Sequence, residues 1–175
     1  MSDQPTTTVD RAALVAELEQ VAARYPHRKS AIIPALRLAQ GHYGWLSPEA
    51  FEDVAHALEC TPAFAQSVAS FYDMFHLTPA GRHLVEVCTN VSCALKGAGE
   101  LLDELEDQLG IHAGETTDDG AITLRTVECL GACANAPCVS VNHRYREDFA
   151  IAQVRPLITE LRASTAGWTD QEREV

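Results

Sequence analysis

The sequence predicts an α/β (α+β) protein with two parts, an N-terminal helical bundle and a second domain that mixes helices with strands. Apolar residues recur at every third or fourth position along roughly the first eighty residues, which is the period of an amphipathic helix. After a break at Thr78-Pro79-Ala80-Gly81, apolar residues alternate or cluster as they do in strands. With 175 residues and 46% hydrophobic content, the chain can form a core without disulfide bonds.

Four short helices are predicted in the first part. Two follow from apolar periodicity, in Leu14, Leu18, Val21 and Tyr25, and then in Ile32, Ile33, Leu36 and Ala39. Two more follow from Ser47-Pro48 and Thr61-Pro62, because a capping hydroxyl before a proline is typical of a helix start. We expect these helices over Pro48–Leu58 and Pro62–Tyr72. The first domain is therefore predicted at residues 1–80, with flexible first residues.

The second domain is predicted at residues 81–163, followed by a polar, loosely held tail at 164–175. Its elements are a strand at HLVEVC (83–88), a helix at LLDELEDQLG (101–110), strands at AITLRTV (121–127) and CVSVN (138–142), and a helix over Ile151–Arg162. This order suits a small α/β sandwich with a right-handed first crossover. We expect the second and third strands to pair as a hairpin.

Charge and hydropathy narrow the class of partner. The formal net charge of −12 argues against binding to nucleic acid or to an anionic membrane surface. The polar start MSDQPTTTVD does not resemble a signal peptide, and no run approaches the roughly eighteen apolar residues of a membrane span. We therefore expect an intracellular protein with no direct membrane insertion, and a protein partner remains open.

Two cysteine pairs are the main candidates for chemistry. Cys88 and Cys93 flank four residues, and Cys129 and Cys133 flank three. Reduced cytosolic thiols disfavour disulfides, and thiol–disulfide catalysis of the thioredoxin type needs a C-x-x-C pair that the chain lacks. A structural zinc site with four Cys ligands remains open, although zinc ligands usually come in tighter knuckles. A [2Fe–2S] cluster, which needs two thiolates on each iron, fits two separated pairs better.

The residues between the cysteines favour the cluster. The segment Thr89 to Ser92 offers backbone N–H groups in a loop, and Gly131 is expected to let the backbone approach the sulfur atoms closely. No Gly-rich phosphate loop follows a strand, so we do not expect this chain to bind NADH or FMN by itself. We expect Cys138 and Cys60 to pack as small apolar residues, with a reserve ligand as the alternative for Cys138.

Four longer segments resemble one known family closely. They are YPHRKSAIIPALRLAQGHYGWLSPEA, VASFYDMFHLTPAGRH, VCTNVSC and ECLGACANAP, and the resemblance runs from about Tyr25 to Leu161. The family is the 24-kDa-type, or E-type, [2Fe–2S] subunit of NADH:quinone oxidoreductase, bacterial complex I. The resemblance implies a helical bundle followed by a thioredoxin-like [2Fe–2S] ferredoxin domain. It also implies that one cluster is bound by Cys88, Cys93, Cys129 and Cys133.

The resemblance further implies a role and a setting. An electron-transfer subunit of this kind docks on a flavoprotein subunit that carries FMN and oxidises NADH, and it joins other subunits of the peripheral arm. The complex lies on the cytoplasmic side of the cell membrane and belongs to a respiratory chain. The chain itself is then a subunit of an oxidoreductase and not catalytic alone. Two alternatives stay open: the equivalent subunit of an NAD-dependent formate dehydrogenase or bidirectional hydrogenase, and a zinc-stabilised interaction module without redox chemistry.

Overall fold

The structure is a computed structural model of the chain, and it describes residues 9–169. The flexible first residues predicted from the sequence, 1–8, lie outside the described range. The chain divides into two compact units on either side of the bond between Pro79 and Ala80. None of the helices described within residues 9–169 combines the length and hydropathy that a membrane span requires.

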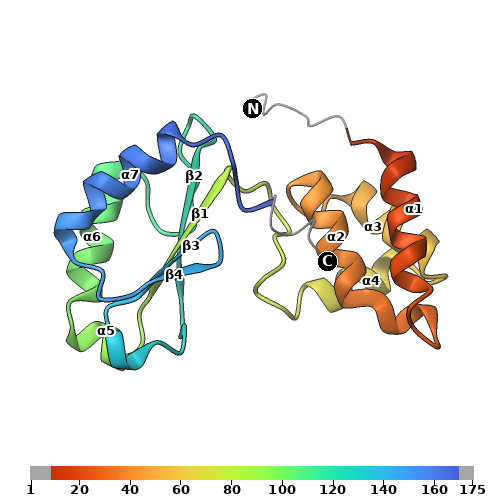
Figure 1. The fold of residues 1–175 in the computed structure, drawn as a ribbon, viewed down its shortest axis with the longest axis horizontal. Helices are drawn as coiled ribbons and strands as arrows, with labels where there is room; N and C mark the ends of the chain where they lie inside the picture. Colours follow the sequence, from red (N-terminus) through yellow and green to blue (C-terminus); the bar gives the residue numbers. More distant parts are fainter. Residues whose placement is uncertain (1–8, 170–175) are drawn as a thin grey trace. The chain divides into compact units, whose positions relative to one another are not determined.

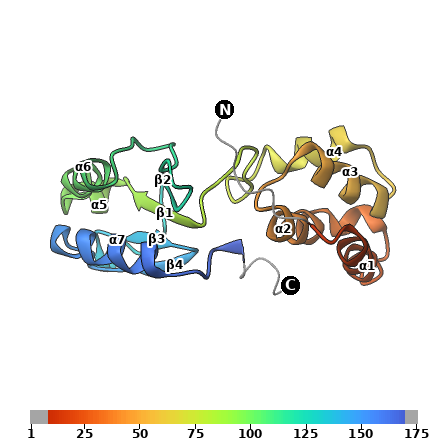
Figure 2. The ribbon, with the colours of Figure 1, turned by 90° about the horizontal axis from the view of Figure 1, so that it is seen from above.

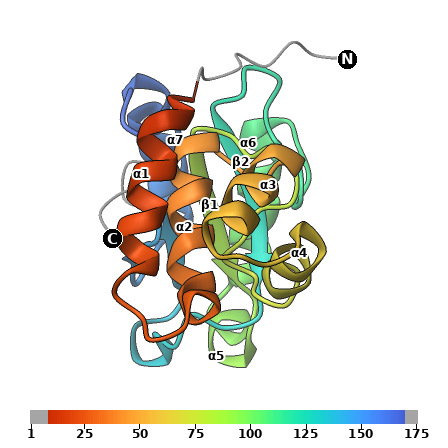
Figure 3. The same ribbon diagram turned by 90° about the vertical axis from the view of Figure 1, so that its right-hand side faces the viewer.

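The first unit is a helical bundle, as predicted (Figures 1 and 3). Its elements are α1 (Arg11–Ala22), the 3-10 turn η1 (Arg28–Ala31), α2 (Ile32–Tyr43), α3 (Pro48–Ala57) and α4 (Pro62–Ala69). The hydroxyls of Ser47 and Thr61 accept hydrogen bonds from the third residue that follows, each over 3.2 Å. Both predicted helix starts are therefore confirmed, and α4 ends three residues earlier than its apolar pattern indicates.

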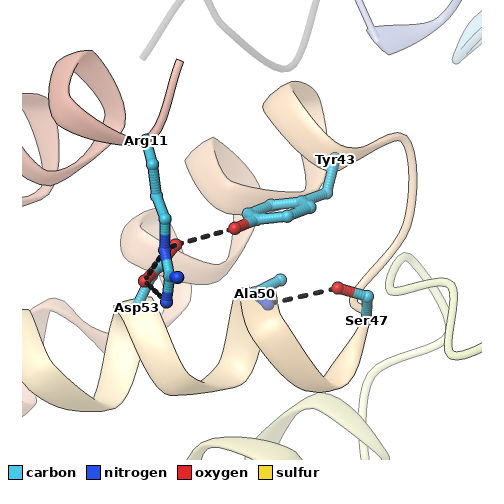
Figure 4. Close-up of polar contacts among 5 residues, drawn as sticks. All are labelled: Arg11, Tyr43, Ser47, Ala50 and Asp53. Atoms are coloured by element: carbon cyan, nitrogen blue, oxygen red, sulfur yellow. Dashed lines mark hydrogen bonds and ion pairs between the residues drawn. The ribbon is translucent and has the colours of Figure 1, made fainter. Parts of the chain in front are cut away.

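A buried carboxylate joins three of these helices. Asp53 on α3 is 4% exposed, and it accepts hydrogen bonds from Nη2 of Arg11 at 2.6 Å and from the hydroxyl of Tyr43 at 2.8 Å (Figure 4). Burial, followed by the bond to Asp53, raises the pKa of Tyr43 to about 12. The apolar core around it is drawn from all four helices and includes Leu14, Leu18, Leu36, Val54 and Leu58.

The second unit contains the sheet. Its elements are β1 (His83–Cys88), α5 (Val91–Leu95), α6 (Ala98–Leu109), β2 (Ile122–Val127), η2 (Cys133–Asn135), β3 (Val139–Val141), β4 (Arg144–Arg146), η3 (Ile151–Gln153) and α7 (Val154–Ala163). The strand order is β2-β1-β3-β4. β1 runs parallel to β2 and antiparallel to β3, and β3 is antiparallel to β4. The mixed helix and strand class is confirmed.

The predicted hairpin between the second and third strands is wrong. β1 lies between β2 and β3, and β3 forms its hairpin with the short strand β4. The turn of that hairpin is Asn142 and His143, with φ of 51° and 62°, which suits the right-handed twist of paired strands. An apolar pattern marks a strand but does not name its neighbour, and all six residues of β1 are buried, as befits a central strand.

Helices α6 and α7 pack together over the sheet (Figures 1 and 2). Their apolar faces meet alternate residues of the strands in one core, which includes Leu101, Leu105, Val154, Leu157, Val85, Val87 and Leu124. Val85 and Val87 point into this core and hold β1 in place. Cys88 is the last residue of the same strand, so β1 also fixes the position of Cys88.

The segment after α7 differs from the loose tail that the sequence predicts. Trp168 is 1% exposed, and its indole N–H donates to the carbonyl oxygen of Gly81 over 2.9 Å. Its backbone N–H donates to the carbonyl of Arg82. A Cβ at Gly167 would lie 2.6 Å from that same carbonyl oxygen, so the segment runs very close to the start of β1. Residues 170–175 of the predicted tail lie outside the described range.

Candidate metal centre

The four predicted ligands lie in two loops at one edge of the sheet. Cys88 is the last residue of β1, and it is in register with Val127, the last residue of the parallel strand β2. The segment after β1 carries Cys93 on α5, and the segment after β2 carries Cys129 and then Cys133 at the start of η2. Because parallel strands end at the same edge, both cysteine loops leave the sheet together.

A short helix that the sequence pattern does not show holds Cys93. Cys93 lies inside α5, a helix of five residues whose start is capped by the side chain of Asn90, accepting from the N–H of Val91 over 2.9 Å. So short a helix leaves no apolar period in the sequence. The consequence is that Cys93 is held by a helical turn, with its side chain facing Cys88 across the loop.

The first pair of thiols is buried and closely coupled. Cys88 and Cys93 are each 3% exposed. Burial acts to raise the pKa of Cys88, but hydrogen bonds from the N–H groups of Asn90 and Leu130 and from neighbouring thiols bring that pKa below its usual value. The pKa of Cys93 is raised, first by burial and then by the adjacent Cys88, although the N–H of Cys138 opposes the rise. Within this pair, Cys88 is thus the first thiol to ionise.

Contacts also connect this pair with the second loop. The neighbouring thiol of Cys129 helps to lower the pKa of Cys88, and the charge of Cys133 helps to raise the pKa of Cys93. Cys129 and Cys133 are exposed to solvent, in contrast to the first pair. All six cysteines of the chain are free thiols in the structure. The four predicted ligands are therefore brought together as two pairs, one buried and one at the surface.

Backbone N–H groups are directed at the sulfur atoms. In the second loop, the N–H of Gly131 donates to Sγ of Cys129 over 3.3 Å. Gly131 has φ of +76°, a conformation that favours glycine, but nothing lies within 4 Å of a Cβ built at this position. The expected close approach of the backbone to sulfur at Gly131 agrees with this 3.3 Å contact, and the positive φ, which turns the N–H toward the sulfur, is the reason that glycine suits the position.

Cys138 lies beside the buried pair. It is fully buried in a small cluster with Cys88, Cys93, Ala98 and Ala136. Burial, together with the negative charges of Cys93, Glu147 and Cys88, raises the pKa of Cys138 to about 11. The structure therefore packs Cys138 as a small buried residue beside the predicted ligands. Cys60, in contrast, packs partly buried against the helical core of the first unit.

The donor set fits an iron–sulfur cluster. Thiolates are soft ligands that suit zinc and iron–sulfur centres, and N–H groups directed at sulfur are the usual surroundings of a cluster. Within residues 9–169, no group of three or more His, Cys, Asp or Glu side chains is arranged to hold a single metal ion. The agreement with an iron–sulfur cluster therefore depends on the paired thiols, on the N–H groups directed at sulfur and on the position of both pairs at one edge of the sheet.

An open cavity of about 610 Å³ lies next to Ala136 and Pro137, between the start of α6 and the segment before α7. Its polar lining consists of Lys96, Glu100 and Asp148, and its apolar lining includes Leu101, Pro137 and Phe149. No cysteine lines it. The thiols therefore lie outside this cavity, although Ala136 belongs both to its lining and to the cluster around the buried thiols.

Comparison with known proteins agrees with this geometry. Residues 18–162 match the family described as thioredoxin-like [2Fe-2S] ferredoxin. The second E-type subunit of NADH-quinone oxidoreductase from Rhizobium meliloti is 47% identical over 148 residues, which cover 85% of this chain and 88% of that protein. NADH-quinone oxidoreductase subunit 2 of Thermus thermophilus is 42% identical over 149 residues, covering 83% of this chain and 82% of the relative.

Two further likenesses involve longer proteins. NADH dehydrogenase [ubiquinone] flavoprotein 2 of Dictyostelium discoideum is 44% identical, and the match covers 83% of this chain and 60% of that protein. The crystal structure of an NAD+-reducing [NiFe]-hydrogenase in the air-oxidized state superposes with a TM-score of 0.64 at 24% identity, covering 89% of this chain and 24% of that one, which shows a shared fold. The resemblance to the E-type subunit seen in the motifs is confirmed, and the chain belongs to the thioredoxin-like [2Fe-2S] ferredoxin family.

Proposed function

We propose that this chain is an electron-transfer subunit of a respiratory NADH:quinone oxidoreductase and that Cys88, Cys93, Cys129 and Cys133 bind one [2Fe–2S] cluster. The observation that carries the proposal is the meeting of two thiol pairs at one sheet edge, with backbone N–H groups directed at their sulfur atoms. When bound, such a cluster accepts and donates one electron at a time. Membership of the ferredoxin family supports this assignment.

The protein's own part is to hold the sulfur atoms and to set their surroundings. Burial of Cys88 and Cys93 excludes water from one side of the site, and the N–H groups of Asn90 and Leu130 stabilise negative charge on Cys88. Hydrogen bonds of this kind and exposure to solvent are the main determinants of a cluster's reduction potential. The protein supplies position and electrostatics, while the redox chemistry is that of the cofactor.

The proposed partner is the flavoprotein of the same complex that binds FMN and NADH. Two features support docking at the cysteine loops. Cys129 and Cys133 are exposed, and α5 presents Val91 and Leu95 to solvent at 66% and 83% exposure. Exposed apolar side chains of this size around a redox site are typical of a surface that another protein covers. Within such a complex, the chain belongs to the peripheral arm on the cytoplasmic side of the membrane.

The deciding experiment is anaerobic purification of the whole chain, with iron, zinc and acid-labile sulfide counted on one sample. We expect about two irons and two sulfides per chain, visible absorption that bleaches with dithionite, and an electron paramagnetic resonance signal on reduction. Cys129→Ser should lower the iron content, whereas Cys60→Ser, in the helical unit, should retain it. Stoichiometric zinc without sulfide would instead establish the structural zinc module.

The partner is tested by affinity purification of a tagged chain from its native cell. A flavoprotein that carries FMN and oxidises NADH, recovered with quinone-reducing subunits, is the expected result. Recovery of a formate dehydrogenase or hydrogenase subunit instead would leave the cluster assignment unchanged and assign the chain to that other complex. The substitution Leu95→Asp should abolish recovery of the partner without changing iron content, because it places a charge on the proposed docking surface.

A further inference from the structure

The segment Glu147 to Phe149, directly after β4, lies against the second cysteine loop. The backbone N–H of Asp148 donates to the carbonyl of Asn135 over 2.8 Å. The next N–H, that of Phe149, donates to the carbonyl of Pro137 over 2.9 Å. Two successive amides of one segment thus hold two carbonyls of the loop that carries Cys129 and Cys133.

A side-chain contact strengthens this connection. The amide of Asn135 donates to Oε2 of Glu147 over 2.6 Å, and both residues are exposed. Asn135 is the last residue of η2, and Cys133 is the first. Since the two lie in one helical turn, the bond to Glu147 restrains the turn that presents Cys133.

The segment is a firm support for the loop. Phe149 is 4% exposed and packs into the core beneath α6 and α7, which fixes one end. Asp148 has φ of +47°, so the chain turns sharply there, and Asp is one of the few residues besides glycine that accept this conformation. Cys133 itself has no such anchor, because its side chain is exposed.

We propose that Glu147 and Asn135 are positioning residues for the cysteine site: their side-chain hydrogen bond holds η2 so that Cys133 faces the other three sulfur atoms. This inference rests on the proposed function of the four cysteines. Cys88 and Cys93 are fixed by a strand, a helix and burial, whereas Cys133 depends on hydrogen bonds of its loop. Cys133 is therefore a ligand whose position a surface substitution can change.

The first test compares Glu147→Ala, Asn135→Ala and Glu147→Gln in the whole chain purified anaerobically. Iron should be lost to a chelator about five-fold faster from both alanine variants, which is the scale of one typical net hydrogen bond. Glu147→Gln should lose iron at the wild-type rate, because its amide oxygen still accepts from Asn135. Glu147→Gln removes the same negative charge as Glu147→Ala. The comparison therefore separates the effect of the hydrogen bond from the effect of the charge.

A second test exchanges the donor and the acceptor of the hydrogen bond between residues 135 and 147. Asn135→Asp sets two carboxylates against each other and should speed iron loss at least as much as Asn135→Ala. Adding Glu147→Gln restores a donor and an acceptor with their roles exchanged, so the double variant should return to the wild-type rate. The visible circular dichroism of the cluster, which reports the geometry of its ligands, should change in the single variant and recover in the double variant.

The matched control is Glu104→Ala. Glu104 on α6 accepts from the side-chain amide of Gln108 over 3.0 Å, which is the same kind of bond at a distance from the cysteines. Its loss should leave iron release and circular dichroism unchanged. Equal release from wild type, Glu147→Ala and Asn135→Ala, with two irons bound in each, overturns the positioning role and leaves the cluster in place. Absence of iron from the wild type overturns the proposed function instead.

Discussion

The backbone N–H of Cys88 donates to the carbonyl oxygen of Cys138 over 3.2 Å, so the last residue of β1 lies beside the residue that precedes β3. The contact is made by main-chain atoms and does not require a thiol at position 138. The side chain of Cys138 fills a small apolar space between Ala98 and Ala136. Its role in the structure is therefore that of a small buried residue.

Cys138→Ala should accordingly retain the cluster. Loss of the buried sulfur leaves a small cavity, and we expect the free energy of unfolding to fall by about 1 kcal/mol. The absorption and electron paramagnetic resonance spectra should match those of wild type. Cys93→Ala serves as the comparison and should lose iron. A shifted spectrum in Cys138→Ala would show that its thiol acts on the metal.

Asp53→Ala should destabilise the helical unit strongly. The substitution leaves the partly buried hydroxyl of Tyr43 without its acceptor, which costs about 1–3 kcal/mol, whereas the exposed guanidinium of Arg11 can be hydrated. Thermal unfolding followed by circular dichroism measures the change. Glu52→Ala, the exposed neighbour, should unfold within a degree or two of wild type. Similar unfolding temperatures for the two variants would contradict the importance of the Asp53 contacts.

Trp168→Ala should destabilise the second unit. The indole is 1% exposed and bonded to Gly81, and truncation of a buried tryptophan costs about 3 kcal/mol or more. Trp168→Phe keeps most of the packing but loses the N–H donor, so its cost should be smaller, about 1 kcal/mol. Urea denaturation monitored by circular dichroism gives both values. A wild-type midpoint for Trp168→Ala would show that the buried indole adds nothing.

The second unit should lose stability in mild acid through His83. Burial, and then the charge of Arg82, holds the pKa of His83 below its ordinary value of 6.5. The side-chain oxygen of Asn142 accepts from the N–H of Leu84, so its amide nitrogen faces Nδ1 of His83 at 3.0 Å and finds an acceptor only on the neutral ring. As the pH falls below 6.5, the unfolded chain takes up the proton first, and stability decreases.

His83→Gln removes this proton uptake. Urea midpoints at several pH values between about 7.5 and 5, which bracket the ordinary histidine pKa, provide the measurement. The variant should lose less stability than wild type over this range, although it starts from a lower value. Parallel curves for the two proteins would mean that His83 titrates normally.

Much of the fold and the cysteine set could be predicted because they depend on local signals. Proline after a capping hydroxyl marked two helix starts, alternation marked β1, and the spacing of the cysteines selected the site. β4 was missed because Arg-Tyr-Arg is exposed and shows no apolar alternation. Trp168 was missed because no apolar period surrounds it in the sequence, while its burial depends on a contact with the distant Gly81.

The positioning contact illustrates a different limit. Asn135 and Glu147 are exposed polar residues, and neither differs from an ordinary surface residue in the sequence. Their contact depends on the β3–β4 hairpin returning the chain to the cysteine loop. The sequence pattern predicted the wrong pairing partner for β3. It therefore could not show that Asn135 and Glu147 meet beside Cys133.

The central position of β1 has a consequence for biosynthesis. The described core of the helical unit comes only from residues before Ala80, so its helices can form while the rest of the chain is still on the ribosome. The cysteine site cannot form at that stage, because β1 needs both β2 and β3 as neighbours before Cys88 meets the other predicted ligands. Iron and sulfide are therefore expected to enter after synthesis is almost complete, and cells short of either should accumulate a folded, colourless protein.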